Sequence, residues 1–262
     1  MSFATLQVPA APIRFLPIQR ESPTRAPTAL KTQCSSCHLR ELCLPCGLDA
    51  GDVTQLDTLM FGRRRVKAGN TLYHEGGSFQ FIYAVRSGTF KSSLALSDGR
   101  EQVSGFHVAG ELMGLDGVAQ GTHASSAIAL EDSEICAIPY TQLTDLTASS
   151  GNLQRSVSRL MSREIVREHT LMLLLGSMNA DERLAAFLLN FSQRLKALGY
   201  SASEFHLRMS RAEIGSYLGM KLETVSRTFS AFQKRGLLEV DKRHIQIVDM
   251  DGLRRTFESR MH

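Results

Sequence analysis

The chain has 262 residues, of which 43% are hydrophobic and 21% charged, and its formal net charge is +4. This length allows one or two domains with their own cores, and the composition is that of an ordinary globular protein. No apolar run approaches a membrane span, and the proline-broken N-terminus lacks the features of a secretory signal. We therefore expect a cytoplasmic protein with no membrane partner.

The charge is unevenly distributed along the chain. Residues 51–154 hold 7 Lys/Arg and 11 Asp/Glu, a net of −4, whereas residues 155–262 hold 18 and 12, a net of +6. The basic C-terminal part is the expected place for a polyanion such as nucleic acid. A solvated basic surface would give the same count, so charge alone does not decide between the two.

The N-terminal region, residues 1–50, combines a proline-rich arm with a cysteine segment. Residues 1–33 carry five of the seven prolines and show no clear periodicity, so they are expected to be mostly disordered. Four of the five cysteines follow within thirteen residues, in the stretch CSSCHLRELCLPC. In a reducing cytoplasm such a cluster indicates a metal site or redox chemistry rather than a disulfide framework.

The cysteine spacing allows two sets of metal ligands, because thiolates suit both zinc and iron–sulfur clusters. The local set pairs Cys34 and Cys37 with Cys43 and Cys46 in a small zinc knot. Zinc ribbons, however, usually separate their pairs by roughly 15–20 residues. The second set replaces Cys46 by the distant Cys136, which gives four thiolates that fit a [4Fe–4S] cluster. Spacing does not choose between them, since an isolated Cys136 is also typical of a buried small hydrophobe.

Residues 51–151 predict an antiparallel β-roll domain. Short β-rich pieces such as QFIYAVRS, FKSSLALS and EQVSGFHV alternate with glycines placed every eleven residues. These glycines are Gly77, Gly88, Gly99, Gly110 and Gly121. Turn signals at a spacing of about 8–12 residues are typical of a sandwich or roll. The last strand is expected to end near Pro139.

Residues 152–177 predict one long helix that mediates dimerisation. The stretch lacks proline and has glycine only near its end. A stripe with alternating steps of three and four residues indicates a coiled-coil seam, with packing on its own domain as the alternative. The stripe consists of Ser158, Met161, Ile165, Glu168, Met172 and Leu175. In a parallel pair Glu168 would face and repel its symmetry mate, so we expect a weak homodimer.

Residues 178–252 predict a winged helix-turn-helix. Ser210 followed by Glu213 is a capping box that starts a helix, and Gly219 allows the tight turn after that helix. A second helix is expected from Leu222 to Lys234, followed by a hairpin of LLEV and HIQIVD. Together with the β-roll this gives an α+β fold class.

The start of the second helix offers residues that can read DNA, because this part of a helix-turn-helix meets base edges in the major groove. Arg227 can donate two hydrogen bonds to guanine, Glu223 can accept one from cytosine, and Ser226 can contact thymine. Nearby basic residues are candidates for phosphate contacts, namely Arg208, Arg211, Lys221, Lys234, Lys242 and Arg243. Double-stranded DNA is thus the expected partner, with a protein-binding winged helix as the alternative.

From residue 33 to residue 249 the sequence resembles the FNR-type oxygen-sensing regulators of the CRP/FNR superfamily. The resemblance is carried by C-x2-C-x5-C at Cys34, by SEICAIP around Cys136, by NADERLAAFLLN and by GSYLGMKLETVSR. It implies that the second ligand set binds an oxygen-labile [4Fe–4S] cluster. It also implies that the three base-reading residues recognise TTGAT half-sites of a palindrome, and that the dimer contacts RNA polymerase. Such a protein regulates transcription and is not an enzyme.

Several positions depart from the pattern of that family. Cys46 is an extra thiol, and His38 follows a ligand where a small residue is usual. Gly99-Arg100 reverses the charge of a Gly-Asp loop that is thought to touch RNA polymerase. No Lys or Arg occurs in residues 101–154, where cyclic-nucleotide sensors of the superfamily place a cation. A buried phosphate without a countercharge is costly, so we expect no cyclic nucleotide.

Overall fold

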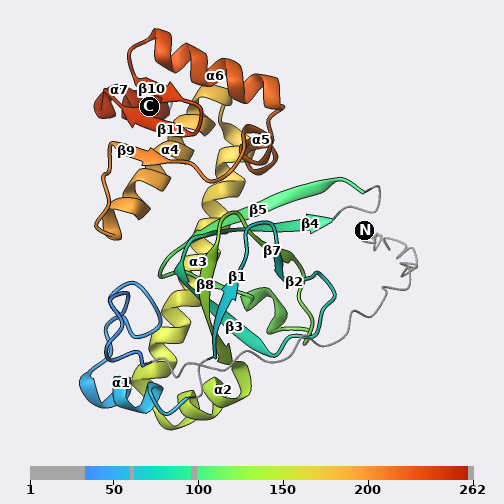
Figure 1. The fold of residues 1–262 in the computed structure, drawn as a ribbon, viewed down its shortest axis with the longest axis vertical. Coiled ribbons are helices and arrows are strands. Elements are labelled where there is room, and N and C mark those ends of the chain that lie inside the picture. The colour runs from blue at the N-terminus through green and yellow to red at the C-terminus, as the bar shows by residue number, and fades with distance from the viewer. Residues whose placement is uncertain (1–32, 60–61, 96–98, 259–262) are drawn as a thin grey trace, which may run out of the picture.

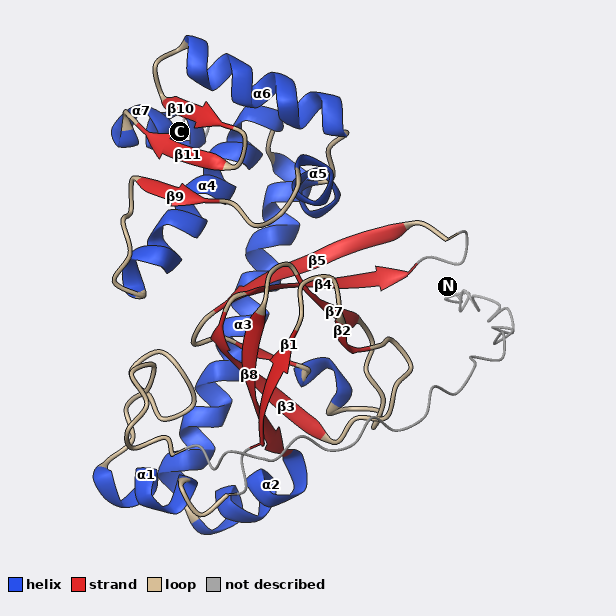
Figure 2. Cartoon of the chain, in the orientation of Figure 1, coloured by secondary structure: helices blue, strands red, loops and turns tan. Residues whose placement is uncertain are grey.

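The computed structural model of the chain describes residues 33–59, 62–95 and 99–258 (Figure 1). The expectation of a disordered arm over residues 1–33 lies, apart from Gln33, outside them. The long helix α3 (Gly151–Ser177) runs past the β-roll and leads into the C-terminal domain (Figure 2). Within the described residues, no helix is both long enough and apolar enough to span a membrane.

The β-roll consists of two four-stranded antiparallel sheets, with the strand orders β1-β8-β3-β6 and β2-β7-β4-β5. The strands are β1 (Gly62–Val66), β2 (Thr71–Tyr73), β3 (Phe81–Ser87), β4 (Thr89–Ala95), β5 (Glu101–Val108), β6 (Leu112–Met113), β7 (Ser126–Ala129) and β8 (Ser133–Pro139). A short 3-10 helix, η1 (Leu115–Gly117), follows β6. Val85, Phe90 and Ile135 are almost fully buried between the sheets. Gly88 has a φ of 88°, which lets the chain turn tightly from β3 into β4.

Two short helices, α1 (Ala50–Leu56) and α2 (Tyr140–Ser149), flank the start of α3. The buried carboxylate of Asp52 accepts hydrogen bonds from Ser150 and Asn152, each at 2.8 Å. These bonds fix α1 against the N-terminus of α3. A second core joins this region to the first sheet and includes Leu44, Leu48, Leu56, Ile82, Ile138 and Leu153.

The C-terminal domain has the expected winged helix-turn-helix, and the α+β fold class is confirmed. Its elements are α4 (Ala180–Ala197), β9 (Glu204–His206), α5 (Arg211–Leu218), α6 (Leu222–Lys234), β10 (Leu238–Asp241), β11 (His244–Ile247) and α7 (Met250–Glu258). The capping box of Ser210 and Glu213 starts α5. Gly219 adopts a left-handed φ of 62° and allows the turn into α6.

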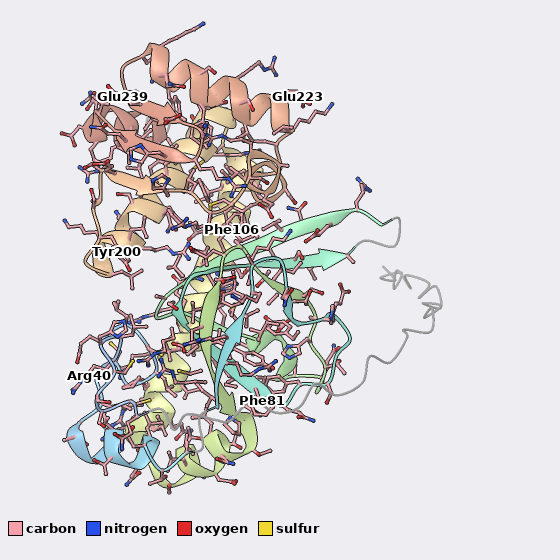
Figure 3. The ribbon with its side chains drawn as sticks, viewed as in Figure 1. Arg40, Phe81, Phe106, Tyr200, Glu223 and Glu239 are labelled. Atoms are coloured by element: carbon pink, nitrogen blue, oxygen red, sulfur yellow. The ribbon has the colours of Figure 1, made fainter. Side chains whose placement is uncertain are left out.

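The β-roll and the C-terminal domain share one hydrophobic core. Phe106 on β5 is only 3% exposed, packs among residues of α4 and α5, and lies where the two parts meet (Figure 3). The amide of Val103 donates to Ser216 Oγ at 2.9 Å, and Lys91 pairs with Glu213 at 3.2 Å. The first helix of the helix-turn-helix is therefore held directly against β5.

Gly215 on α5 lies where a side chain would collide with the helix-turn-helix turn. A Cβ there would lie 2.6 Å from the carbonyl oxygen of Met220. We expect Gly215→Ala to destabilise the C-terminal domain by about 1–3 kcal/mol, as overpacking does, and to lower its thermal unfolding midpoint. Gly176→Ala on α3 is the control, because nothing lies within 4 Å of the added atom. Equal midpoints for the two variants would contradict this account of the turn.

Candidate metal centre and nucleic-acid interface

Four of the five cysteines line one small cavity between the N-terminal segment and the first sheet. Cys34, Cys37 and Cys43 come from the segment before α1, and Cys136 comes from β8. Apolar side chains complete most of the wall, namely Leu44, Pro45, Ala84 and Ile138. Cys46 does not line this cavity, and its amide donates to the Cys43 carbonyl at 3.0 Å. The structure therefore brings together the second ligand set and leaves the extra thiol aside.

The surroundings of these thiols favour their neutral form when no metal is bound. Burial raises the pKa of Cys34 well above its usual range, and the nearby thiolates and Asp57 raise it further. Burial also raises the pKa of Cys43 to about 12, and it raises the pKa of Cys136. Several thiolates in one buried space repel one another, so ionisation requires a compensating cation. Metal binding supplies that compensation as it displaces the thiol protons.

The four cysteines line the wall of one shared space. In the described part of the chain, no group of three or more His, Cys, Asp or Glu side chains is placed to hold a single metal ion. In a [4Fe–4S] cluster each thiolate binds a different iron, so the ligands surround the group. Four soft donors in a mostly apolar wall fit such a cluster in both number and chemistry.

The cysteine segment is fixed to its neighbours by hydrogen bonds on two sides. The amides of Cys34 and Ser35 both donate to the Asp57 carboxylate at the end of α1. Ser156 on α3, which is 2% exposed, donates to the carbonyl of Leu44 at 2.9 Å. A displacement of this segment would therefore act directly on α3.

Charged residues that the sequence pattern did not identify adjoin the same cavity. The Arg86 Nη1 atom lies 3.6 Å from Cys37 Sγ, and the Arg86 Nε atom lies 3.4 Å from the Glu134 carboxylate. Arg63 pairs with the same carboxylate at 2.6 Å. Glu134 and Cys136 are two residues apart on β8, so their side chains share one face of the strand, and this spacing predicts the glutamate beside the ligand. No sequence signal pointed to Arg86.

The recognition helix α6 presents its predicted base-reading residues to solvent. Glu223, Ser226 and Arg227 are exposed, while Val225 and Phe229 are buried against the domain core. Glu223 lies at the start of α6, at the end of the molecule remote from the cysteine segment (Figure 3). A face with these side chains, unobstructed within the described chain, is suited to entry into a major groove.

The candidate phosphate ligands fall into two groups. Arg211 lies on the Phe229 ring, 3.3 Å from its centroid, and burial lowers the pKa of Arg211 to about 10. Arg208 pairs with Glu131 of the β-roll at 3.0 Å. These two arginines have structural contacts of their own. Arg208 is nevertheless exposed, as are the remaining members of the set, namely Lys221, Lys234, Lys242 and Arg243.

Helix α3 carries an exposed apolar stripe along the predicted seam. Met161, Ile165 and Met172 are 37%, 55% and 66% exposed. Val166 and Leu173, which the seam pattern omitted, are also exposed large hydrophobic residues. Exposed apolar surface of this kind on a helix is suited to pairing with a second copy.

The remaining seam positions have different surroundings. Ser158 is exposed, whereas Leu175 is half-buried, with its side chain beside Gly219 at the turn between α5 and α6. Glu168 is exposed among the apolar residues. Partial burial raises the pKa of Glu168, and Arg167 opposes this effect. The carboxylate thus lies where a pairing partner would desolvate it further.

A cavity of about 590 Å³ lies between the β-roll and α3. None of the described residues that line it is a Lys or Arg, and its charged residues include the acids Asp116, Glu164 and Glu168. Burial lowers the pKa of His107 in its wall to about 4, so this imidazole is neutral near neutral pH. The cavity therefore offers little positive charge to a bound phosphate.

A β-roll, a long helix and a winged helix-turn-helix together define a class of DNA-binding transcription regulators. Residues 182–256 match the Crp-like helix-turn-helix domain, and residues 63–150 match the cyclic nucleotide-binding domain. The chain belongs to the CRP/FNR superfamily, and within it to the FNR-like transcriptional regulators. The family that the sequence resembles is thereby confirmed.

The chain matches known transcriptional regulators over nearly their whole length. The chain is 48% identical over 221 residues to the transcriptional regulatory protein btr of Bordetella pertussis, covering 84% of this chain and 91% of that protein. It is 43% identical over 220 residues to the fumarate and nitrate reduction regulatory protein of Escherichia coli K12, covering 84% and 88%. The solved structure of FixK2 from Bradyrhizobium japonicum matches with a TM-score of 0.70 and 31% identity, covering 76% and 98%. The expectation that the protein is not an enzyme is confirmed.

Proposed function

We propose that the protein is a cytoplasmic, oxygen-responsive regulator of anaerobic gene expression. A [4Fe–4S] cluster held by Cys34, Cys37, Cys43 and Cys136 would control its dimerisation and DNA binding. The observation that carries the proposal is the single cavity that all four thiols line. When bound, the cluster supplies an oxygen-labile link between the cysteine segment and β8.

The cysteine segment can act on the dimer surface through α3. Ser156 on α3 donates a hydrogen bond to the Leu44 carbonyl of the cysteine segment. Ser150, the N-cap of α3, donates one to the Asp52 carboxylate of α1. A segment tied to β8 through its thiolates would fix this end of α3 in one position. The apolar stripe further along α3 would then pair with its mate despite the charge of Glu168. The homodimer is thus a two-state element whose equilibrium the cluster biases.

A partly buried ion cluster connects α3 and the β-roll to the C-terminal domain. Glu111, which follows β5, accepts from Arg194 on α4 at 2.8 and 2.6 Å. Arg167 on α3 lies 3.2 Å from the same carboxylate. Burial opposes ionisation of Glu111, but the two arginines outweigh it and keep its pKa below the usual range. Three parts of the molecule therefore meet at one charged residue, which gives α3 a route to the DNA-binding domain.

A symmetric dimer would present two α6 helices to the two halves of a palindrome. We propose that Glu223, Ser226 and Arg227 read TTGAT half-sites, which suits their exposure on one helix. RNA polymerase is the proposed protein partner at the promoter. A cyclic nucleotide is not proposed as a ligand, because the lining of the cavity beside α3 supplies no Lys or Arg for its phosphate.

Arg227→Ala should weaken specific DNA binding by about 1–3 kcal/mol and relax the base preference at its contact, because it removes a bidentate donor. Lys221→Ala is the matched comparison, since it removes a charge next to α6 without removing a base contact. We expect it to weaken binding to all sequences alike and to reduce the salt dependence. Titrations of specific and random duplexes at several salt concentrations measure both effects. Equal losses on the two duplexes for Arg227→Ala would exclude it from base recognition.

Anaerobic purification tests the proposed function as a whole. We expect iron and sulfide in a ratio of one to one, visible charge-transfer absorbance, and a dimer that binds the palindrome. Exposure to air should remove the colour, and specific binding should fall with it. A colourless anaerobic protein that contains zinc, or that responds only to thiol oxidants, would instead support a structural zinc site or a thiol switch.

A further inference from the structure

One arginine beside the cysteine cavity lies at a β-bulge. Strands β3 and β8 pair residue by residue up to Val85 opposite Ile135, but the next pair is Ser87 opposite Glu134. One extra residue therefore lies on β3 between these pairs, and this residue is Arg86. A bulge leaves the extra residue outside the ladder, and bulges are common next to functional sites.

The Arg86 guanidinium contacts a thiol of the cavity. Its Nη1 atom lies 3.6 Å from Cys37 Sγ, which is within the hydrogen-bonding range of sulfur. Its Nε atom lies 3.4 Å from the carboxylate of Glu134, which orients the planar group. The Arg86 side chain is only 20% exposed, so solvent screens these interactions weakly.

The other charges around the cavity leave a positive excess at this side. Glu134 is shared between Arg86 and Arg63, so two cations face one anion. Arg40 also lines the cavity, but its side chain is 45% exposed and pairs with Glu41 at 2.9 Å. A cluster bound to four thiolates is an anion in a mostly apolar wall. Arg86 is the cation whose donor reaches a ligand sulfur.

We propose that Arg86 tunes the redox stability of the cluster. The inference rests on the proposed function, because it requires that the four cysteines hold an iron–sulfur cluster. Hydrogen bonds to the sulfurs and the net charge of the surroundings set the potential of such a cluster. A cation and donor at Cys37 stabilise the more reduced form, which carries the more negative charge. Dioxygen would oxidise a bound cluster by accepting one electron from it and becoming superoxide, and Arg86 would oppose that loss of an electron.

Four variants of the full-length protein test the proposal. Arg86→Gln removes the charge, and Arg86→Lys keeps the charge but loses the planar fork. Glu134→Gln removes the neighbouring negative charge, so its effect has the opposite sign. Arg64→Gln is the matched control, because Arg64 is an exposed arginine of β1 that lies on the face opposite to its neighbour Arg63.

The midpoint potential of the anaerobic protein and the rate of colour loss in air-saturated buffer are measured for each variant. We expect Arg86→Gln to shift the one-electron equilibrium about tenfold toward the oxidised form, which corresponds to about 59 mV. Its colour should be lost several times faster than in the parent. The potential of Arg86→Lys should lie between those of the parent and Arg86→Gln. Glu134→Gln should raise the potential, and Arg64→Gln should match the parent.

Each failure has its own meaning. A parent protein that takes up no iron and sulfide would overturn the proposed function and this inference with it. A parent that holds the cluster while Arg86→Gln keeps the parental potential would overturn the inference alone, as would an equal shift in Arg64→Gln. If Arg86→Gln cannot be loaded, Glu134→Gln decides, because a potential that does not rise in that variant overturns the electrostatic role.

Discussion

Replacing Cys136 with serine should leave the anaerobically purified protein almost without iron, sulfide and visible absorbance. Cys136 is the one cavity-lining thiol that the β-roll contributes, and it pairs in register with Arg63 on β1 and Ala84 on β3. A serine hydroxyl is a hard donor that does not replace a soft thiolate. Without this ligand the cysteine segment has no bond through the cluster to β8, so the loss should extend to dimerisation and DNA binding.

Cys46→Ser is the matched control for this experiment. Cys46 lies three residues after Cys43 but outside the cavity wall, so its replacement should leave iron and sulfide near the parental content. Circular dichroism of both variants would show whether the fold is retained. If Cys46→Ser loses the metal and Cys136→Ser keeps it, the local four-cysteine site is correct and the assignment to β8 is wrong.

The parts of the fold with local sequence signals could be predicted from the sequence. The capping box of Ser210 and Glu213 and the left-handed Gly219 define the start and the end of α5, and both depend only on nearby residues. The strands of the β-roll follow from residue alternation and from turn glycines such as Gly88. The uninterrupted helical pattern predicts a helix over residues 152–177, and α3 starts one residue earlier and ends at the same residue.

The candidate metal site could be predicted only in part. The spacing of the first three cysteines is a local signal, but the choice between Cys46 and Cys136 depends on how β8 lies against the N-terminal segment. Spacing left that choice open, and only the family resemblance favoured Cys136. Arg86 contacts Cys37 from a bulge, and a bulge depends on the register of two strands far apart in the sequence. Such registers are tertiary properties that hydrophobic periodicity does not encode.

For the same reason, the sequence contains no local signal for the ionic connection between the domains. Glu111 and Arg194 are 83 residues apart, and each looks like an ordinary solvated charge in the sequence. Their pairing is visible only once β5 lies against the C-terminal domain. Likewise, the seam pattern included Leu175, which is half-buried beside the turn after α5, and omitted the exposed Val166. A heptad pattern shows which residues share a helix face but not what covers that face.

Glu168→Ala should make the protein dimeric and able to bind specific DNA even in air. Met161, Ile165 and Met172 expose apolar surface for pairing, and the Glu168 carboxylate lies among them. Pairing would bring this carboxylate close to its symmetry mate and desolvate it, and both effects oppose association while it is ionised. Without the cluster this opposition should keep the parent monomeric. Removing the charge should let the apolar surface associate without cluster control, and sedimentation of the aerobic protein measures the change.

The pH dependence gives a second measure of the same carboxylate. Partial burial raises the pKa of Glu168 above its usual range, so protonation should begin at a higher pH than for an ordinary glutamate. As the pH falls, the repulsion between paired carboxylates is lost and the aerobic parent should associate more strongly. Glu168→Ala should show much less of this dependence, because it has already lost the charge.

Glu164→Ala is the control for the loss of any carboxylate from α3. Glu164 lies one helical turn before Glu168, but it is only partly exposed and it contacts Arg167 at 3.3 Å, so it lies beside the exposed stripe rather than at its centre. We therefore expect Glu164→Ala to remain as monomeric in air as the parent. The seam or the role of its carboxylate would be misassigned if Glu168→Ala remained monomeric in air. It would also be misassigned if both variants dimerised equally, because the charge at the centre of the stripe should distinguish Glu168→Ala from Glu164→Ala.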